Sequence, residues 1–230
     1  MTGSDHSHRR AGETTGAMRE PVNGWLHFAG AVAAAVGLVV LAVEARGRPS
    51  VRHLAGALTF GATATLLFAA SAMYHLRPSS PRASLYRRLD HAMIYIFIAG
   101  TYTPLCLVAL WSTATGRVLL AVVWALALLG VAIEMLPRRT PRGVSVALYL
   151  GLGWVGLLAV PSLSREAPAP LVWWLLVGGI LYTVGAVVYW RKWPYGRPGV
   201  FGFHELWHSF VIAASASHYW AVVAYVLPMG

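Results

Sequence analysis

Residues 25–43, WLHFAGAVAAAVGLVVLAV, decide the fold, because they contain no Asp, Glu, Lys or Arg. A helix of about 20 apolar residues, rising 1.5 Å per residue, crosses the roughly 30 Å hydrocarbon core of a bilayer. The whole chain has the same character: of its 230 residues, 57% are hydrophobic and 11% charged, where soluble domains carry about 25% charged residues. Strands of a membrane barrel would appear as alternating segments of about 10 residues. The apolar segments here are continuous and longer, so they predict membrane-spanning helices.

Seven such segments follow one another along the chain, separated by short gaps, most of which contain Pro and Arg. We expect an all-α membrane protein, a bundle of seven transmembrane helices, because helices satisfy every backbone polar group inside lipid. Residues 1–22 are polar and predict a disordered tail, and residues 23–230 form the membrane domain. The expected spans are residues 24–43, 54–75, 90–110, 117–136, 144–162, 171–190 and 202–227.

The basic residues predict the orientation of the bundle. The net charge of +10 suggests a nucleic-acid partner at first, but the basic residues lie in the gaps between apolar segments, so we exclude that partner. Thirteen of the 18 Lys and Arg residues fall in the tail and in the gaps after the second, fourth and sixth spans, and five fall on the opposite side. Positive charge accumulates on the cytoplasmic side. We therefore expect a multi-pass protein of the cell membrane with its N-terminus inside and its C-terminus outside.

Several polar residues converge on the cytoplasmic end of this topology. His75 ends the second span, Asp90 begins the third, and His204 and His208 open the seventh. The two histidines of the last span are four residues apart, which places both imidazoles on one helix face with about 6 Å between Cβ atoms. Neutral imidazoles so placed can bind a divalent cation. Ser71 stands one turn before His75, from where its hydroxyl can reach the same pocket.

Each of these residues also has a simpler explanation. A single His at the end of a span is commonly an interfacial polar residue. Asp90 alone fits a first-turn carboxylate that complements the helix dipole, and Ser71 alone fits small-residue packing between helices. The prediction of a site therefore depends on their common depth.

Other polar residues within the spans are interpreted as packing or hydrogen-bonding groups. His27 lies near the cytoplasmic end of the first span, His91 points away from Asp90, and His218 lies about 15 Å deeper than His208. Glu134 is expected to pair with the arginine four residues later.

The order of short motifs along the chain resembles the hemolysin III family, bacterial relatives of the progestin and adipoQ receptors. The resemblance covers residues 20 to 227. Leu26 stands where relatives often have Thr, and Ala213 and Ala214 stand where they often have Gly. The motifs that carry it are NGWLH at 23–27 with Gly30, SAMYH at 71–75, LDH at 89–91, AGTYTP at 99–104, FHELWH at 203–208, and His218.

The resemblance implies a zinc site. The wider superfamily, which includes proteins similar to alkaline ceramidases, shares a Ser and a His on the second span, an Asp on the third and a His-x-x-x-His on the seventh. Carried over residue by residue, this implies that His75, His204 and His208 bind Zn²⁺. Asp90, which contacts the water of the site in relatives, and Ser71 take the supporting catalytic roles.

Three functions remain open from the sequence. The first is a zinc-dependent hydrolase of a lipid amide or ester, since three protein ligands and one open position characterise catalytic zinc, and a membrane lipid is then the substrate. The second is a non-catalytic receptor or sensor in which zinc ties spans together and a lipid is the ligand. The third is a membrane-lytic or conducting protein, against which the largely apolar outer halves of the spans argue.

Overall fold

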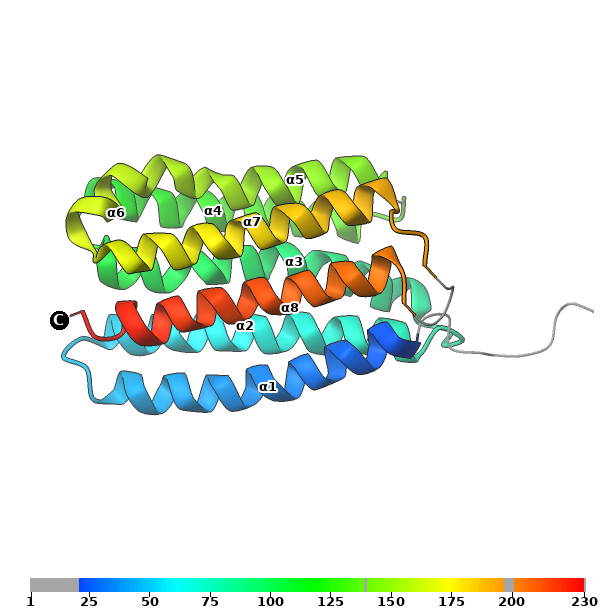
Figure 1. The fold of residues 1–230 in the computed structure, drawn as a ribbon, viewed down its shortest axis with the longest axis horizontal. Helices are drawn as coiled ribbons and strands as arrows, with labels where there is room; N and C mark the ends of the chain where they lie inside the picture. Colours follow the sequence, from blue (N-terminus) through cyan, green and yellow to red (C-terminus); the bar gives the residue numbers. More distant parts are fainter. Residues whose placement is uncertain (1–20, 139, 197–200, 230) are drawn as a thin grey trace, which may run out of the picture.

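The computed structural model describes residues 21–138, 140–196 and 201–229, and within these residues it contains seven helical segments long and apolar enough to span a membrane (Figure 1). The chain is therefore a multi-pass membrane protein. The fifth span is α5 and α6 joined by a 3₁₀ turn, and the third and seventh spans each end in a short π-helix. The helices are α1 Pro21–Arg46, α2 Val51–Leu76, α3 Ala83–Pro104 with the π-helix Leu105–Ala109, α4 Ala114–Met135, α5 Arg142–Trp154 with the 3₁₀ turn Val155–Ala159, α6 Val160–Glu166, α7 Ala169–Arg191, and α8 Phe203–Ala221 with the π-helix Val222–Val226.

The helix ends follow local signals in the sequence. Ser50 precedes α2 with extended backbone, and its hydroxyl accepts a hydrogen bond from the amide of Arg52 at 3.3 Å. Thr113 caps α4 in the same way through the amide of Gly116 at 3.0 Å. Such caps satisfy amides that have no partner within the helix. α4 ends at Met135, two residues before Pro137, whose ring disfavours helical backbone in the residue before it.

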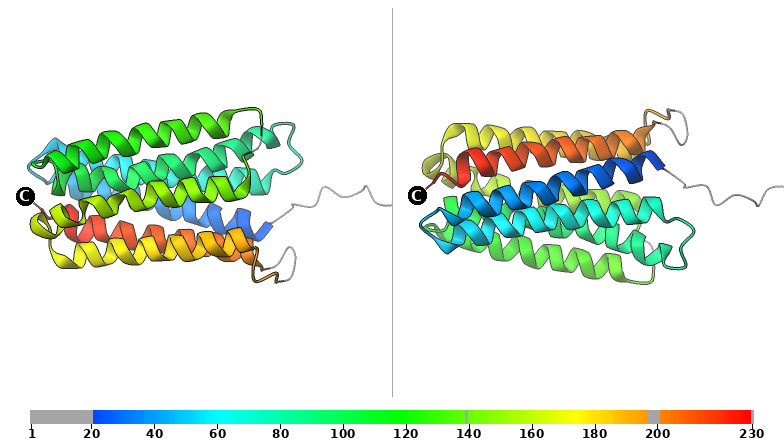
Figure 2. Two further views of the ribbon diagram at one scale, coloured as in Figure 1. Left: turned by 90° about the horizontal axis from the view of Figure 1, so that it is seen from above. Right: turned by 90° about the horizontal axis from the view of Figure 1, so that it is seen from below.

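The helices lie side by side with nearly parallel axes, and most pack against their neighbours in sequence (Figure 2). α2 packs mainly against α1 and α3, and α8 packs mainly against α7. The start of α1, the end of α2 and the starts of α3 and α8 all lie at the same end of the bundle (Figure 1). Segments that are far apart in the sequence therefore meet at one level.

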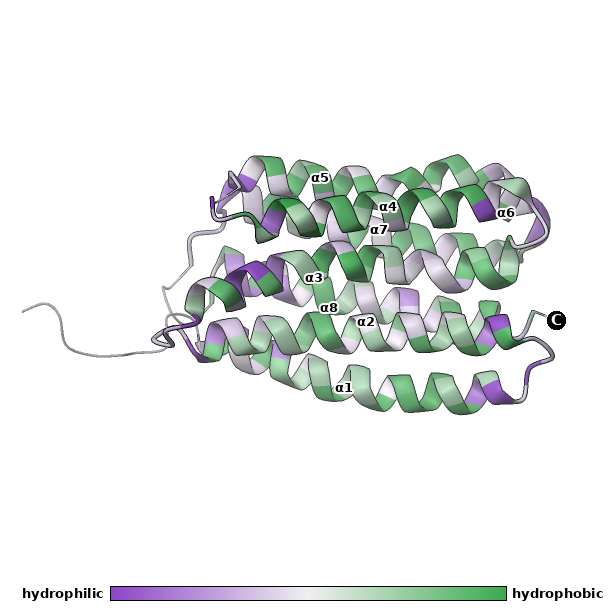
Figure 3. Ribbon diagram, turned by 180° about the vertical axis from the view of Figure 1, so that it is seen from behind, coloured by the Kyte–Doolittle hydropathy of each residue, from purple (hydrophilic) through white to green (hydrophobic). Residues whose placement is uncertain are grey.

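The outside of the bundle is apolar along most of its length, with hydrophilic residues concentrated toward the two ends (Figure 3). On α1, Val32, Val36, Val39 and Val43 are all exposed. A soluble protein seldom exposes a continuous apolar surface of this kind, whereas lipid tails cover it without cost.

Small residues allow the central helices to approach closely. A Cβ added to Gly100 on α3 would lie 2.1 Å from the hydroxyl oxygen of Thr63 on α2. A Cβ added to Gly56 would lie 2.8 Å from the Cα atom of Pro104. Close contact through small residues is the usual mode of helix association in membranes. Here it fixes α3 against α2 along the part of the bundle that lies away from the His-containing end.

Irregular turns interrupt the third and fifth spans. Pro104 cannot donate a helical hydrogen bond, and α3 continues beyond it as a π-helix. Opposite it, α5 changes to the 3₁₀ turn after Trp154. There the Tyr102 hydroxyl lies against the carbonyls of Leu152 and Gly153 and accepts the amide of Gly156 at 2.9 Å. Non-helical backbone at this depth is tolerated because protein groups satisfy it.

The expected spans agree with these helices to within a few residues at most ends, but the start of the third was wrong. α3 begins at Ala83, so Asp90 lies in the interior of the helix, two turns from its start. Charged residues such as Arg87 end the hydrocarbon-spanning part of a helix but not the helix itself, which begins at Ala83, two residues after Pro81. The interpretation of Asp90 as a first-turn carboxylate is therefore excluded. The predicted tail falls almost wholly outside the described residues, and α1 begins at Pro21.

Candidate metal centre

Three imidazoles meet at one end of the bundle. His75 stands in the last turn of α2, and His204 and His208 lie on one face of the first two turns of α8. One ring nitrogen from each lies within 4.8 Å of the others. The ring centroids are 5.1 Å apart for His75 and His204, 5.0 Å for His75 and His208, and 4.7 Å for His204 and His208. This arrangement can hold one metal ion with little movement of the side chains.

The burial of these rings supports a ligand role. His75 is 5% exposed and His208 is 3% exposed. The Nε2 atom of His208 is buried and has no hydrogen-bond partner among the described residues. A buried polar atom without a partner costs free energy, and a metal ion bound by the three rings removes that cost. Imidazole nitrogens suit zinc, copper, iron and nickel rather than magnesium or calcium.

His27 is part of the same cluster, and its contact with His208 agrees with the hydrogen-bonding role that the sequence analysis allowed for it. It lies on α1, is 3% exposed, and its Nε2 atom is 2.5 Å from Nδ1 of His208. The two ring centroids are 3.8 Å apart, and Phe68 meets the other side of the His27 ring edge-on at 5.1 Å. The cluster therefore contains four histidines, of which three form the compact group and the fourth contacts His208.

A second polar contact joins α1 to α8, one helical turn before His27 on α1. The side-chain amide of Asn23 donates to Oε1 of Glu205 at 3.1 Å, and Oε2 of Glu205 accepts the amide of Gly202 at 2.8 Å. The contact between Glu205 and Gly202 is half of a capping box, and it fixes where α8 begins. The start of α8, and with it the direction in which His204 and His208 point, is therefore held by α1.

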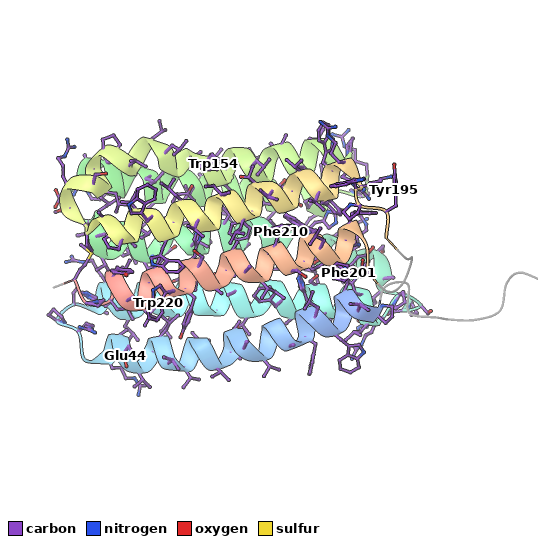
Figure 4. All side chains as sticks on the ribbon, viewed as in Figure 1. Glu44, Trp154, Tyr195, Phe201, Phe210 and Trp220 are labelled. Atoms are coloured by element: carbon purple, nitrogen blue, oxygen red, sulfur yellow. The ribbon has the colours of Figure 1, made fainter. Side chains whose placement is uncertain are left out.

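A cavity of about 650 Å³ adjoins the three imidazoles. Ligand sites in proteins are typically about 300–1,000 Å³ in volume. The cavity runs between the helices toward Trp154 on α5, which is labelled in Figure 4 together with Phe201 near the start of α8. Its polar end holds the histidines, and its remaining wall is largely apolar, with Leu67, Ile94, Phe97, Leu175 and Leu176.

Ser71 and Asp90 line this cavity together with the three imidazoles. The Ser71 side chain is 1% exposed, and its hydroxyl has no hydrogen-bond partner in the described part of the chain. Asp90 is half-buried in the interior of α3 and lines the cavity. The five residues singled out from the sequence therefore border one space.

The remaining polar residues pack as expected, with one exception. His218 places Nε2 3.2 Å from the carbonyl oxygen of Leu175, in agreement with a hydrogen-bonding role. Glu134 turns inward and is 2% exposed, where it accepts a hydrogen bond from Ser145 at 2.9 Å and lies 3.7 Å from Nδ1 of His91. The expected helical pairing of Glu134 with Arg138 was wrong, because α4 ends at Met135.

Comparison with known proteins agrees with the resemblance found in the sequence. The family described as Haemolysin-III related matches residues 15–219. Hemolysin-3 of Bacillus cereus is 32% identical over 210 residues, which cover 91% of this chain and 92% of that protein. The human monocyte to macrophage differentiation factor is 29% identical over 180 residues, 73% of this chain and 68% of its own. The adiponectin receptor protein of Drosophila melanogaster is 25% identical over 223 residues, 87% of this chain and 49% of its own.

Proposed function

The chain belongs to the haemolysin III family, and from that premise we propose that it is a zinc-dependent hydrolase of a lipid amide or ester. The observation that carries the proposal is the group formed by His75, His204 and His208, whose nitrogens lie within 4.8 Å of one another beside a cavity with apolar walls. Catalytic zinc sites hold the metal with three protein ligands and leave one position open. The group supplies that number of ligands.

Zinc is the metal that these donors fit best among those that imidazole binds, because it has no geometric preference of its own and performs hydrolysis without redox change. Bound there, zinc would polarise a substrate carbonyl and lower the pKa of a water to about 7. The chain's own residues supply the rest. Asp90 borders the same cavity, and in this proposal it accepts a proton from the attacking water, a role that typically contributes about 10²–10⁴-fold in rate.

Ser71 and the cavity wall bind the substrate in this proposal. The buried Ser71 hydroxyl has no partner among the described residues, so it can donate a hydrogen bond to a polar group of the substrate. The apolar wall accommodates the acyl chain of the lipid, and the carbonyl of that acyl group lies beside the histidines at the polar end of the cavity. A lipid is the substrate class that combines these two requirements.

The proposal also assigns an orientation. The end of the bundle that carries the histidines is also the end with most of the basic residues, among them Arg77, Arg87, Arg142 and Arg191. The excess of positive charge supports a cytoplasmic position for this end. The N-terminus is then inside, the C-terminus is outside, the membrane is the cell membrane, and the lipid enters from the inner leaflet.

A receptor or sensor is the second candidate, since the adiponectin receptor protein is among the relatives. Under that alternative the metal joins α2 and α8 without chemistry, and the cavity holds a lipid ligand that is not consumed.

The experiment that tests the proposal is an untargeted lipid profile. Membrane lipids are incubated with purified, zinc-loaded native protein, with Asp90→Ala, and with Glu44→Gln, which removes one carboxylate at the opposite end of α1 (Figure 4). We expect native protein and Glu44→Gln to convert the same lipid to a fatty acid and its partner, and Asp90→Ala to leave it unchanged. Equal profiles for all three proteins and a protein-free control would refute the hydrolase and favour the receptor.

A further inference from the structure

We propose that His27 is a positioning residue for His208: it holds the Nδ1 hydrogen of His208 and so turns the Nε2 atom of His208 toward the metal. This inference rests on the metal site of the proposed function. It assigns a role to α1, which supplies none of the three nitrogens of the compact group.

The contact itself is short and buried. Nδ1 of His208 lies 2.5 Å from Nε2 of His27 and 3.1 Å from its Nδ1, and the rings meet at an angle of 78°. Both side chains are 3% exposed. Water therefore does not compete for this contact, and each ring is the other's partner at these nitrogens.

The donor and acceptor roles follow from counting hydrogens. A neutral imidazole has one N–H donor and one acceptor nitrogen. The Nδ1 atom of His208 faces His27, and its Nε2 atom has no hydrogen-bond partner among the described residues. If Nε2 of His208 binds the metal, Nδ1 must carry the hydrogen. Nε2 of His27 must then be the acceptor, with the hydrogen of His27 on its own Nδ1. Metal binding through Nε2 thus selects the tautomer of His208 in which Nδ1 donates to His27 and the lone pair is on the buried Nε2 atom.

The surroundings of His27 fix its orientation. Phe68 packs edge-on against the ring, and a Cβ added to Gly30 would lie 3.2 Å from the Phe68 ring, so Phe68 has little room to turn. One turn before His27, Asn23 binds Glu205 on α8. α1 therefore meets the start of α8 at Asn23 and at His27, and the contact at His27 reaches His208 of the compact group.

The acceptor beside a metal-binding histidine has a known effect on metal affinity. A histidine that binds a metal usually donates its other N–H to a neighbouring acceptor, and loss of that acceptor typically weakens metal binding about 10–100-fold. A carboxylate or a carbonyl is the common acceptor. An imidazole in that position leaves the site without added negative charge, which suits a buried position inside a membrane protein.

Three variants separate positioning from packing. His27→Phe keeps the ring and its contact with Phe68 but removes the acceptor. His27→Gln restores an acceptor at nearly the reach of Nε2. Asn23→Ala is the matched control, because it breaks the neighbouring contact between α1 and α8 without touching His208.

The experiment measures zinc affinity of each purified protein by competition with a chromophoric chelator, together with the absorption spectrum of the Co²⁺-substituted protein. We expect the dissociation constant to rise about 10–100-fold in His27→Phe, to return most of the way in His27→Gln, and to stay within a few-fold of native in Asn23→Ala. The number of zinc ions per chain and the Co²⁺ spectrum should be those of the native protein in all variants, because His27 is not a ligand.

Four results would overturn the inference. Unchanged affinity in His27→Phe, or an equal loss in Asn23→Ala, would reduce His27 to packing. A changed Co²⁺ spectrum in His27→Phe with no rescue by Gln would make His27 a ligand. If the native protein binds no zinc, the proposed function and this inference both fail. If the native protein binds zinc and His27→Phe binds it with the same affinity, the inference alone fails.

Discussion

Removal of the metal should destabilise the bundle at the end where α2 and α8 meet. α2 packs mainly against α1 and α3, and α8 packs mainly against α7. Few contacts therefore link α2 directly to α8, and among them are those of His75 on α2 with His204 and His208 on α8. A metal bound by all three joins helices that are otherwise held through their neighbours.

The size of the effect follows from mass action. A ligand that binds only the folded protein stabilises it by about 2.7 kcal/mol when its free concentration is 100 times the dissociation constant. For a chain of 150–250 residues, each kcal/mol shifts the melting temperature by about 2–4 °C. Zinc at that concentration should therefore raise the melting temperature of stripped protein by about 5–11 °C.

The assay is thermal unfolding of detergent-solubilised protein, stripped with a chelator and then titrated with zinc. His204→Ala/His208→Ala should show no zinc-dependent shift. His218→Ala is the matched control, because it removes a histidine of the same helix that binds the Leu175 carbonyl instead. It should melt lower than native protein and still respond to zinc in full.

Two results would refute the reasoning. A native protein whose melting temperature does not respond to saturating zinc has no folded-state zinc site. A double variant that keeps the shift binds zinc elsewhere, and the three imidazoles are then a packing cluster.

Three further predictions follow from particular positions. Asp90→Asn should keep its zinc, and it should keep its melting temperature because the helix dipole acts only within about one turn of the helix end. The same variant should lower the turnover of the identified lipid about 10²–10⁴-fold. Retained turnover would remove Asp90 from the mechanism. Gly100→Ala should lower the free energy of unfolding, measured by denaturation, by about 1–3 kcal/mol, because the new Cβ would meet Thr63 at 2.1 Å. Gly151→Ala is the control: its new Cβ would meet nothing within 4 Å, so its free energy of unfolding should equal that of the native protein. A reporter fused after Gly230 should be active only outside the cell, and a cytoplasmic C-terminus would overturn the orientation.

The fold could be predicted from the sequence because bilayer thickness sets the length of a span and lipid excludes charge from it. Both constraints act on single segments, so they can be applied without knowing how the helices pack. The common level of His75, His204 and His208 follows from the alternation of spans alone, and the structure confirms that they meet.

The errors arose where packing or local backbone decides. The start of α3 was misplaced because the hydrocarbon boundary near Arg87 does not end a helix that continues into the interface. The partner of Glu134 was misassigned because four-residue spacing has meaning only while the helix lasts, and α4 ends one residue after Glu134.

The partner of His27 could not be predicted because its contact depends on which face of α1 meets α8. The sequence does carry an indication: Asn23 and His27 are four residues apart on an otherwise apolar span, and polar residues within spans usually face the bundle interior. That indication shows that His27 points inward. Only the packing of α1 on α8 shows that it reaches His208 rather than another group.

The most direct test of the zinc site is the zinc content of purified protein, measured by elemental analysis beside His204→Ala/His208→Ala at equal protein concentration. Three imidazoles that share one ion predict about one zinc per chain in the native protein and almost none in the double variant. Equal zinc in the two proteins, or none in the native protein purified without chelator, would contradict the account.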